Sequence, residues 1–246
     1  MIDRNNGRNH VAWDIETTGF GADDVLSVAG FWFPDGHAVL FLNVYTDSQA
    51  DKSHLEQQLS DRSDGLDVTV YVCEGGRDIL VGIRELMFDR FSKDYDRLIA
   101  YNAESWKGGF DLPFVRTRCI KCDLEWVFDG IQFADLYDPL AKRINTTVTT
   151  HGASADANTL TGSHELLAPS QHSLDTLSEY VPDDHPWYAE RWYDPFKTSA
   201  SAVDAYHNER HLDVLLHNLA DIHRTWELGE LIRHYVPSKD ISTKKL

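Results

Sequence analysis

Three short apolar stretches open this sequence, with turn-forming residues between them. They cover residues 10–15, 26–33 and 38–45, and the segments 19–24 and 34–36 between them are built from Gly, Asp and Pro around few apolar residues. Apolar runs of this length, bounded by such residues, are typical of β-strands joined by tight turns. The first 45 residues therefore predict a three-strand meander.

Strands and helices alternate in the next part of the chain. Residues 66–73 and 97–101 are predicted to be strands, and 110–119 is predicted to be a helix. Residues 77–91 place apolar side chains at helical intervals, at Ile79, Ile83, Leu86 and Met87. The polar residues 47–66 predict a loop or an inserted excursion. Strands first and strand–helix alternation afterwards predict an α/β fold, with a mixed sheet and helices on both faces.

The C-terminal half combines an irregular region with a long helix. Residues 145–171 are rich in Thr, Ser, Ala, Gly and His and predict a mobile loop, of the kind in which substrate-covering elements often lie. We expect a helix at 173–180 after an N-cap at Ser173, and an irregular but packed segment at 181–198. Residues 199–235 form the clearest predicted helix, with a core stripe at positions 212, 215, 219, 222 and 226.

Length and composition predict a single soluble domain. The 246 residues suffice for one α/β core, and no internal boundary is visible, so we expect one domain over residues 1–246. No apolar run approaches the roughly 18 residues that span a bilayer, and the N-terminus has no apolar signal core, which predicts a cytoplasmic protein. Cys119 and Cys122 have half the spacing of a zinc site, but without a second pair we expect reduced thiols.

The chain is strongly acidic. Asp and Glu total 40 against 23 Lys and Arg, which gives a formal net charge of −17. One interpretation is a halophilic protein adapted to molar salt, where surface repulsion is screened over about 3 Å; the other is an ordinary acidic protein. Nucleic-acid binders usually carry a basic face. Any affinity for phosphate must therefore come from bound divalent metal and a local patch.

Three groups of acidic residues can carry chemistry. Asp14 and Glu16 stand two residues apart at the end of a predicted strand, so both side chains project to one side. Asp111 stands where an apolar segment enters a helix, a place that the helix dipole alone also favours. His217 and Asp221 lie one turn apart, roughly opposite the core stripe, and therefore face solvent or a cleft. Each group alone also has a structural interpretation, which for His217 and Asp221 is a solvated surface pair.

Together these residues favour a metal centre. Hydrolysis of a phosphodiester by two metal ions needs several carboxylates that converge from different elements. Carboxylates are suitable ligands for Mg²⁺ or Mn²⁺, and a neutral His within reach of the attacking water can act as a general base.

In these motifs the chain resembles the DEDD superfamily of 3′→5′ exonucleases, which have a ribonuclease H-like fold. It is most similar to the proofreading-type exonucleases related to B-family DNA polymerases. The matching segments are Asp14-Ile-Glu16-Thr-Thr-Gly19, Asn102 with Phe110-Asp111-Leu-Pro, and His217-Asn-Leu-Ala-Asp221. The segment that begins at Ser173 resembles the family's helix between the last two. The resemblance implies two Mg²⁺ or Mn²⁺ ions, held by Asp14, Glu16, Asp111 and Asp221, and a single-stranded or 3′-end nucleic acid, DNA or RNA, as substrate.

The resemblance also implies further site residues, with two departures from the family's pattern. We assign Thr17, Phe20, Asn102 and Phe110 to substrate binding; the two Phe side chains lie next to the catalytic motifs and are expected to grip a terminal base. Family members carry a Tyr four residues before the last Asp or a His five before it; here His217 stands at the Tyr position, and we interpret it as the general base. Asn102 is also farther from Phe110 than is usual. The alternatives are a non-catalytic nucleic-acid-binding module and a ribonuclease H-like endonuclease.

Overall fold

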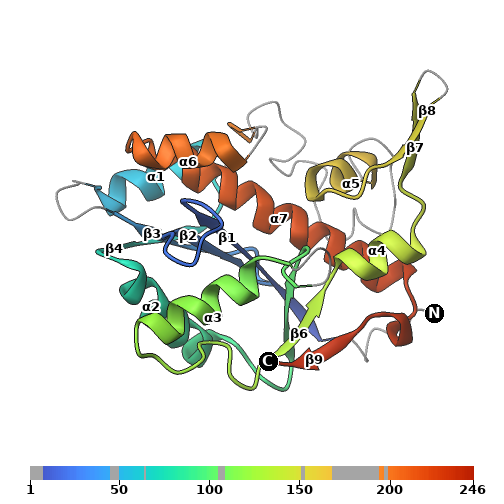
Figure 1. Cartoon of the computed structure of the whole chain (residues 1–246), viewed down its shortest axis with the longest axis horizontal. Helices are drawn as coiled ribbons and strands as arrows, with labels where there is room; N and C mark the ends of the chain where they lie inside the picture. Colours follow the sequence, from blue (N-terminus) through green and yellow to red (C-terminus); the bar gives the residue numbers. More distant parts are fainter. Residues whose placement is uncertain are drawn as a thin grey trace.

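The computed structural model describes residues 8–44, 50–63, 65–104, 109–150, 153–167, 194–196 and 199–246. In these residues the chain forms a seven-stranded mixed sheet between two layers of helices (Figure 1). The strand order is β4-β3-β2-β1-β5-β6-β9. The strands are β1 (Asn9–Thr17), β2 (Leu26–Trp32), β3 (Ala38–Asn43), β4 (Val68–Cys73), β5 (Asp96–Ala100), β6 (Gln132–Asp135) and β9 (Thr243–Lys245).

The predicted meander is confirmed. Strand β1 pairs antiparallel with β2, and β2 pairs antiparallel with β3. The later strands are added parallel to this meander, β4 beside β3, β5 beside β1, and β6 beside β5, while β9 closes the edge antiparallel to β6. The predicted mixed α/β fold is therefore confirmed, and its topology is compatible with a ribonuclease H-like fold. Strand β1 is central, with three strands on each side.

Helices cover both faces of the sheet, as the alternation of strands and helices predicted. Helices α2 (Gly76–Arg90) and α3 (Asp111–Lys121) contribute to the hydrophobic cluster of one face, and α1 (Lys52–Arg62), α4 (Tyr137–Arg143), α6 (Ser199–His207) and α7 (His211–Tyr235) to that of the other. Strand β1 divides its side chains between the two: Val11, Trp13 and Ile15 join the α2–α3 side, and Ala12 joins the α7 side. Because neighbouring side chains of a strand alternate, Asp14 and Glu16 continue the row of Ala12 and face α7.

Two expectations about the helices are wrong. Residues 47–66 do not form a loop throughout, because α1 spans Lys52–Arg62 and Asp51 caps its N-terminus through the backbone N–H of His54. The helix was missed because it buries only Leu55 and Leu59, so its apolar pattern is weak. The single helix expected at 199–235 is two helices, separated near Glu209, which has a left-handed backbone conformation with φ of 55°.

The expected irregular loop at 145–171 is also wrong for the described residues. These form a hairpin of β7 (Thr147–Thr150) and β8 (Ala153–Asp156), followed by α5 (Leu160–Leu167). The hairpin projects from the body of the molecule at the upper right of Figure 1. Its Thr side chains have a high strand propensity but bury little apolar surface, so no alternating pattern marks it in the sequence. That this region is mobile stays a prediction. The helix expected at 173–180 lies outside the described residues.

Two smaller expectations can be compared with the structure. Cys119 and Cys122 are free thiols, as expected, and Cys73 is a free thiol as well. Among the residues that the structure describes, no helix has the length and apolar character needed to cross a membrane.

Candidate metal centre

The central strand delivers two carboxylates to a helix that approaches it unusually closely. Asp14 lies opposite Gly30 of β2 in the sheet register, and Asn218 of α7 donates a hydrogen bond from Nδ2 to Asp14 Oδ2 at 2.9 Å. A Cβ atom on Gly30 would overlap Asn218 Oδ1. The absence of a side chain at Gly30 therefore lets α7 pack directly over the end of β1.

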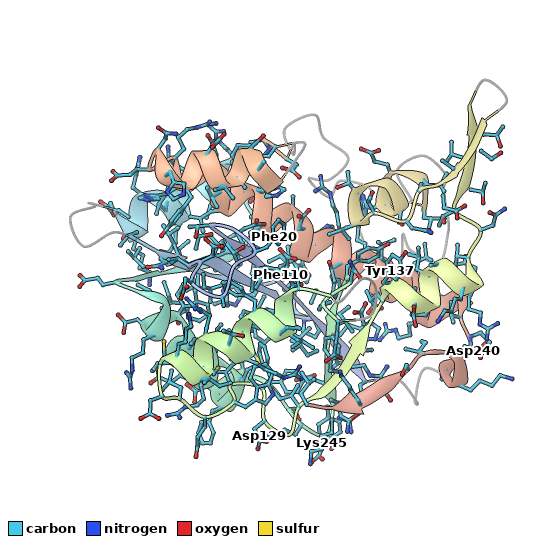
Figure 2. The ribbon with its side chains drawn as sticks, in the orientation of Figure 1. Phe20, Phe110, Asp129, Tyr137, Asp240 and Lys245 are labelled. Atoms are coloured by element: carbon cyan, nitrogen blue, oxygen red, sulfur yellow. The ribbon has the colours of Figure 1, made fainter. Side chains whose placement is uncertain are left out.

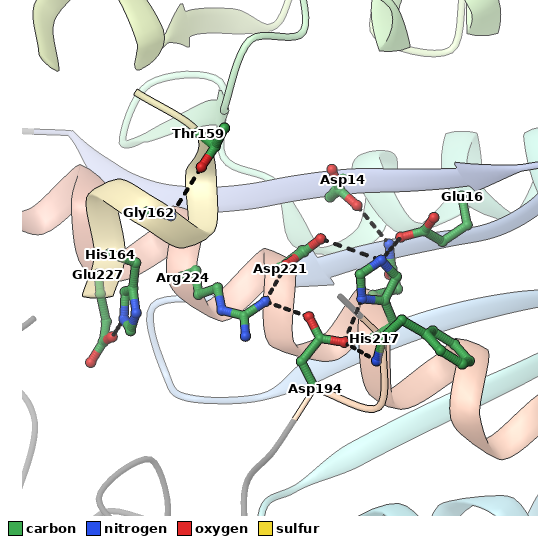
Figure 3. A network of polar contacts seen from close by, with 12 residues as sticks. Asp14, Glu16, Thr159, Gly162, His164, Asp194, His217, Asp221, Arg224 and Glu227 are labelled. Atoms are coloured by element: carbon green, nitrogen blue, oxygen red, sulfur yellow. Dashed lines mark hydrogen bonds and ion pairs between the residues drawn. The ribbon is translucent and has the colours of Figure 1, made fainter. Parts of the chain in front are cut away.

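Helix α7 places His217 and Asp221 against Glu16 (Figure 3). The Nε2 atom of His217 lies 3.7 Å from Glu16 Oε1 and 3.8 Å from Asp221 Oδ2. One ligand atom from each of the three residues lies within 4.8 Å of the others, close enough to surround one metal ion. The side chains are largely buried, with exposed fractions of 8% for His217 and 17% for Asp221. The pair thus faces a cleft, one of the two placements expected from the helical spacing.

The four predicted carboxylates line one cleft of about 910 Å³. Asp14 and Glu16 come from β1, Asp111 begins α3, and Asp221 comes from the middle of α7. Strand β5 is parallel to β1, so the chain leaves it at the same end of the sheet and enters α3 there. Residues that are about 100 and 200 positions apart in sequence are therefore brought to one place by the sheet topology.

The pKa values of the carboxyl groups in this cluster are raised by burial and by mutual repulsion. Burial, followed by the charges of Glu16, Asp111 and Asp221, raises the pKa of Asp14 well above its usual value. Burial and the charge of Glu16 do the same for the pKa of Asp111. The pKa of Glu16 rises to about 7, because burial and nearby carboxylates outweigh the opposing charge of His217. A divalent cation among these oxygens would relieve both the burial and the repulsion, so the donor set fits such an ion.

Asp194 and Arg224 extend this cluster, and the sequence analysis missed both. Asp194 accepts a hydrogen bond from His217 Nδ1 at 2.7 Å and another from Arg224 at 2.7 Å. Arg224 also donates to Asp221 Oδ1 at 2.6 Å. Burial opposes protonation of His217, but the hydrogen bond to Asp194 and the surrounding carboxylates raise its pKa to about 9. Arg224 had one possible sequence signal, its position three residues after Asp221; Asp194 had none.

The predicted substrate-binding residues line the same cleft. The ring of Phe20, which is 82% exposed, meets the ring of Phe110 edge to face, with centroids 5.0 Å apart (Figure 2). The hydroxyl of Thr17 donates to the carbonyl of Gly19 at 2.8 Å. Asn102 has a left-handed backbone, with φ of 58°, and its N–H donates to Asp135 Oδ1 at 2.9 Å. Asp135, at the end of β6, thus holds the loop that carries Asn102.

Part of the wall of the cleft comes from the region predicted to be a loop. Asn158 and Thr159, between the hairpin and α5, and Leu160, the first residue of α5, line it. The Tyr101 hydroxyl donates to the carbonyl of Asn158 at 2.7 Å, which ties this wall to the end of β5. His164 of α5 contacts the carboxylate of Glu227 on α7 (Figure 3). This part of the wall is therefore tied to the end of β5 and to α7.

Comparison with known proteins supports the fold. No protein-family model and no curated protein matches the sequence. Among solved structures, the family B DNA polymerase from the hyperthermophilic archaeon Pyrobaculum calidifontis matches with a TM-score of 0.54 and 16% sequence identity. The match covers 92% of this chain and 25% of the polymerase, so the chain corresponds to about a quarter of that protein. At this identity the likeness is one of fold, and the fold is one found in a DNA polymerase.

Proposed function

We propose that this protein is a metal-dependent 3′→5′ exonuclease, which hydrolyses phosphodiester bonds at nucleic-acid 3′ ends with residues 1–246 as one domain. The convergence of Asp14, Glu16, Asp111 and Asp221 from three elements into one cleft carries this proposal. The fold shared with a family B DNA polymerase supports a nucleic acid as the substrate. The resemblance of the three motifs to DEDD exonucleases supports cleavage at the 3′ end.

The carboxylates would hold two Mg²⁺ or Mn²⁺ ions. When bound, such ions lower the pKa of an attacking water and stabilise the leaving oxygen. Asn218 orients Asp14 through its hydrogen bond, and Arg224 does the same for Asp221. The sequence assigned His217 to the attacking water as a general base, but its distances to Glu16 and Asp221 support a role as a metal ligand.

The rest of the cleft supports binding of a strand end. Phe20 and Phe110 present an edge-to-face aromatic pair at the mouth of the cleft, where an unpaired terminal base could stack. Within the described part of the chain, the residues that line the cleft include neither Lys nor Arg. Phosphate contacts would therefore depend on the metal ions, as the acidic composition also implies.

A 5′-labelled oligonucleotide tests the proposal directly, because its label stays on the shortened strand. In the presence of Mn²⁺ the wild-type protein should shorten it nucleotide by nucleotide, and Asp14→Ala should lower the rate about 100-fold or more, because an ion loses a ligand. Asp89→Ala, which removes an exposed carboxylate on α2, is the matched control and should keep full activity. Metal-dependent shortening that survives Asp14→Ala, or no shortening at all, would refute the assignment.

Two variations of the substrate separate the alternatives. An oligonucleotide blocked at its 3′ end should remain intact with an exonuclease and be cut internally by a ribonuclease H-like endonuclease. Binding without any cleavage in Mg²⁺ or Mn²⁺ would identify a non-catalytic binding module. Matched DNA and RNA strands, compared in high salt, would then show which nucleic acid is preferred.

A further inference from the structure

The two ring nitrogens of His217 face different surroundings. Nδ1 is hydrogen-bonded to Asp194 Oδ1 at 2.7 Å. A carboxylate only accepts, so this bond places the proton of a neutral imidazole on Nδ1. The lone pair of the neutral ring is then on Nε2, which faces Glu16 and Asp221.

The orientation of the His217 ring is set by contacts on its outer side. Asp194 Oδ1 also accepts from the backbone N–H of Phe196 at 2.9 Å, and Asp194 Oδ2 accepts from Arg224. The buried ring of Phe196 packs edge to face on the imidazole, with centroids 5.5 Å apart. The segment from Asp194 to Phe196 therefore holds the ring in one orientation. These contacts alone direct Nε2 toward the carboxylate cluster, without a bound ligand.

The distances around Nε2 are those of neighbouring ligands on one ion. First-row metals and Mg²⁺ bind nitrogen and oxygen at about 2.1 Å, so two ligands of one ion are at most about 4.2 Å apart. Nε2 lies 3.7 Å from Glu16 Oε1 and 3.8 Å from Asp221 Oδ2. An ion between Nε2 and either of these oxygens would thus be within bonding reach of both, and the three ligand atoms lie within 4.8 Å of one another. A general base, by contrast, would contact the metal-bound water and would itself lie outside the ligand shell.

We propose that His217 is a direct ligand of one metal ion, together with Glu16 and Asp221, and that this nitrogen makes the site select Mn²⁺ over Mg²⁺. The inference concerns the same cleft as the proposed exonuclease. Mg²⁺ prefers oxygen ligands and keeps several waters, whereas first-row transition metals accept imidazole readily. Histidine ligands commonly donate their second N–H to a carboxylate, which is the contact made with Asp194.

Arg224 holds two of the carboxylates that surround His217. It engages Asp221 Oδ1 and leaves Oδ2 facing His217. It also bonds Asp194, so one guanidinium holds both the carboxylate behind the imidazole and the carboxylate beside it. Asp194 and Arg224 are positioning residues in this scheme.

Electron spin-echo spectroscopy of untagged protein with Mn²⁺ alone tests the proposal without any nucleic acid. The wild-type complex should show ¹⁴N modulation from a coordinated imidazole, and His217→Ala should abolish it. His54→Ala removes an exposed imidazole from α1 as the matched control and should leave the modulation unchanged. Calorimetry should show that the wild-type protein binds Mn²⁺ at least about 10-fold more tightly than Mg²⁺, and that His217→Ala reduces this ratio.

Asp194→Asn provides a second variant in case His217→Ala fails to fold. It keeps an acceptor for Nδ1 but loses the charge, so the modulation should persist while affinity for Mn²⁺ falls about 10- to 100-fold. Bound Mn²⁺ without ¹⁴N modulation in the wild type would overturn the inference and leave His217 as a base; so would failure to bind Mn²⁺. Modulation in a protein that does not cleave nucleic acid would refute the exonuclease and leave this metal site standing.

Discussion

Glu16 is the residue in which the electrostatics of the cluster can be measured most directly. Its pKa rises from 4.5 to about 7 because the side chain is buried among other carboxylates. The unfolded chain loses this proton near pH 4.5, whereas the folded chain keeps it until about pH 7. Unfolded protein therefore binds fewer protons over this interval, and stability falls as pH rises through it.

We expect the metal-free protein to lose about 3 kcal/mol of unfolding free energy between pH 4.5 and 7 through this group. His217 adds to the trend, because its raised pKa contributes stability that is complete below pH 6.5 and is lost as pH rises through about 9. Urea denaturation in chelator at several pH values measures the slope. Glu16→Gln should flatten the slope between pH 4.5 and 7, and Glu85→Gln, an exposed control, should not. An equal slope in wild type and Glu16→Gln would contradict the assignment.

Among single residues, the sequence predicted those that a local strand, helix or motif pattern marks. Asp14 and Glu16 lie at the end of a strand and Asp111 begins a helix, so the local pattern and the motifs were sufficient to identify them as candidate site residues. The structure places them in one cleft with Asp221. Asp194 and Asp135 act on the site through tertiary contacts, to His217 and to the Asn102 loop. Nothing in the neighbouring sequence of either residue distinguishes it from a solvated aspartate.

Among the elements, the contact between β1 and α7 decides whether the cluster can form. Gly30 leaves the space that Asn218 occupies beside Asp14. Gly30→Ala should push α7 away and lower the unfolding free energy by about 1–3 kcal/mol, because the added methyl overpacks a close contact. It should also weaken Mn²⁺ binding, which calorimetry can measure.

The control for this substitution is Gly76→Ala at the start of α2. A Cβ there meets open space, so the change should be neutral or stabilise the protein by under about 1 kcal/mol. Gly30→Ala with the stability and Mn²⁺ affinity of wild type would show that the close approach is unimportant.

Elements with a strong apolar period were predicted, and those without one were not. The three strands of the meander and helix α2 bury long rows of apolar side chains, and their positions agree with the sequence. Helix α1 and the hairpin bury few such residues, and the separation of α6 from α7 depends on the backbone of one residue, Glu209. None of these features has a strong apolar period of its own, so a local pattern does not record them.

At the scale of the whole molecule, net charge is the dominant feature. A formal charge of −17 spread over 246 residues opposes the compact state in dilute buffer. If the surface is adapted to molar salt, screening should raise the urea midpoint of unfolding between 0.1 M and about 3 M KCl. An uncharged osmolyte at matched water activity controls for general exclusion effects. Equal midpoints at the two salt concentrations would favour an ordinary acidic protein.

The bond between Asn218 and Asp14 joins residues 204 positions apart. Synthesis on the ribosome proceeds from the N-terminus, so β1 emerges long before the helix that completes its carboxylate cluster. A nascent chain that lacks α7 holds Asp14 and Glu16 but not Asp221 or His217. The proposed nuclease would thus remain latent beside messenger RNA until α7 had been made and had packed against β1.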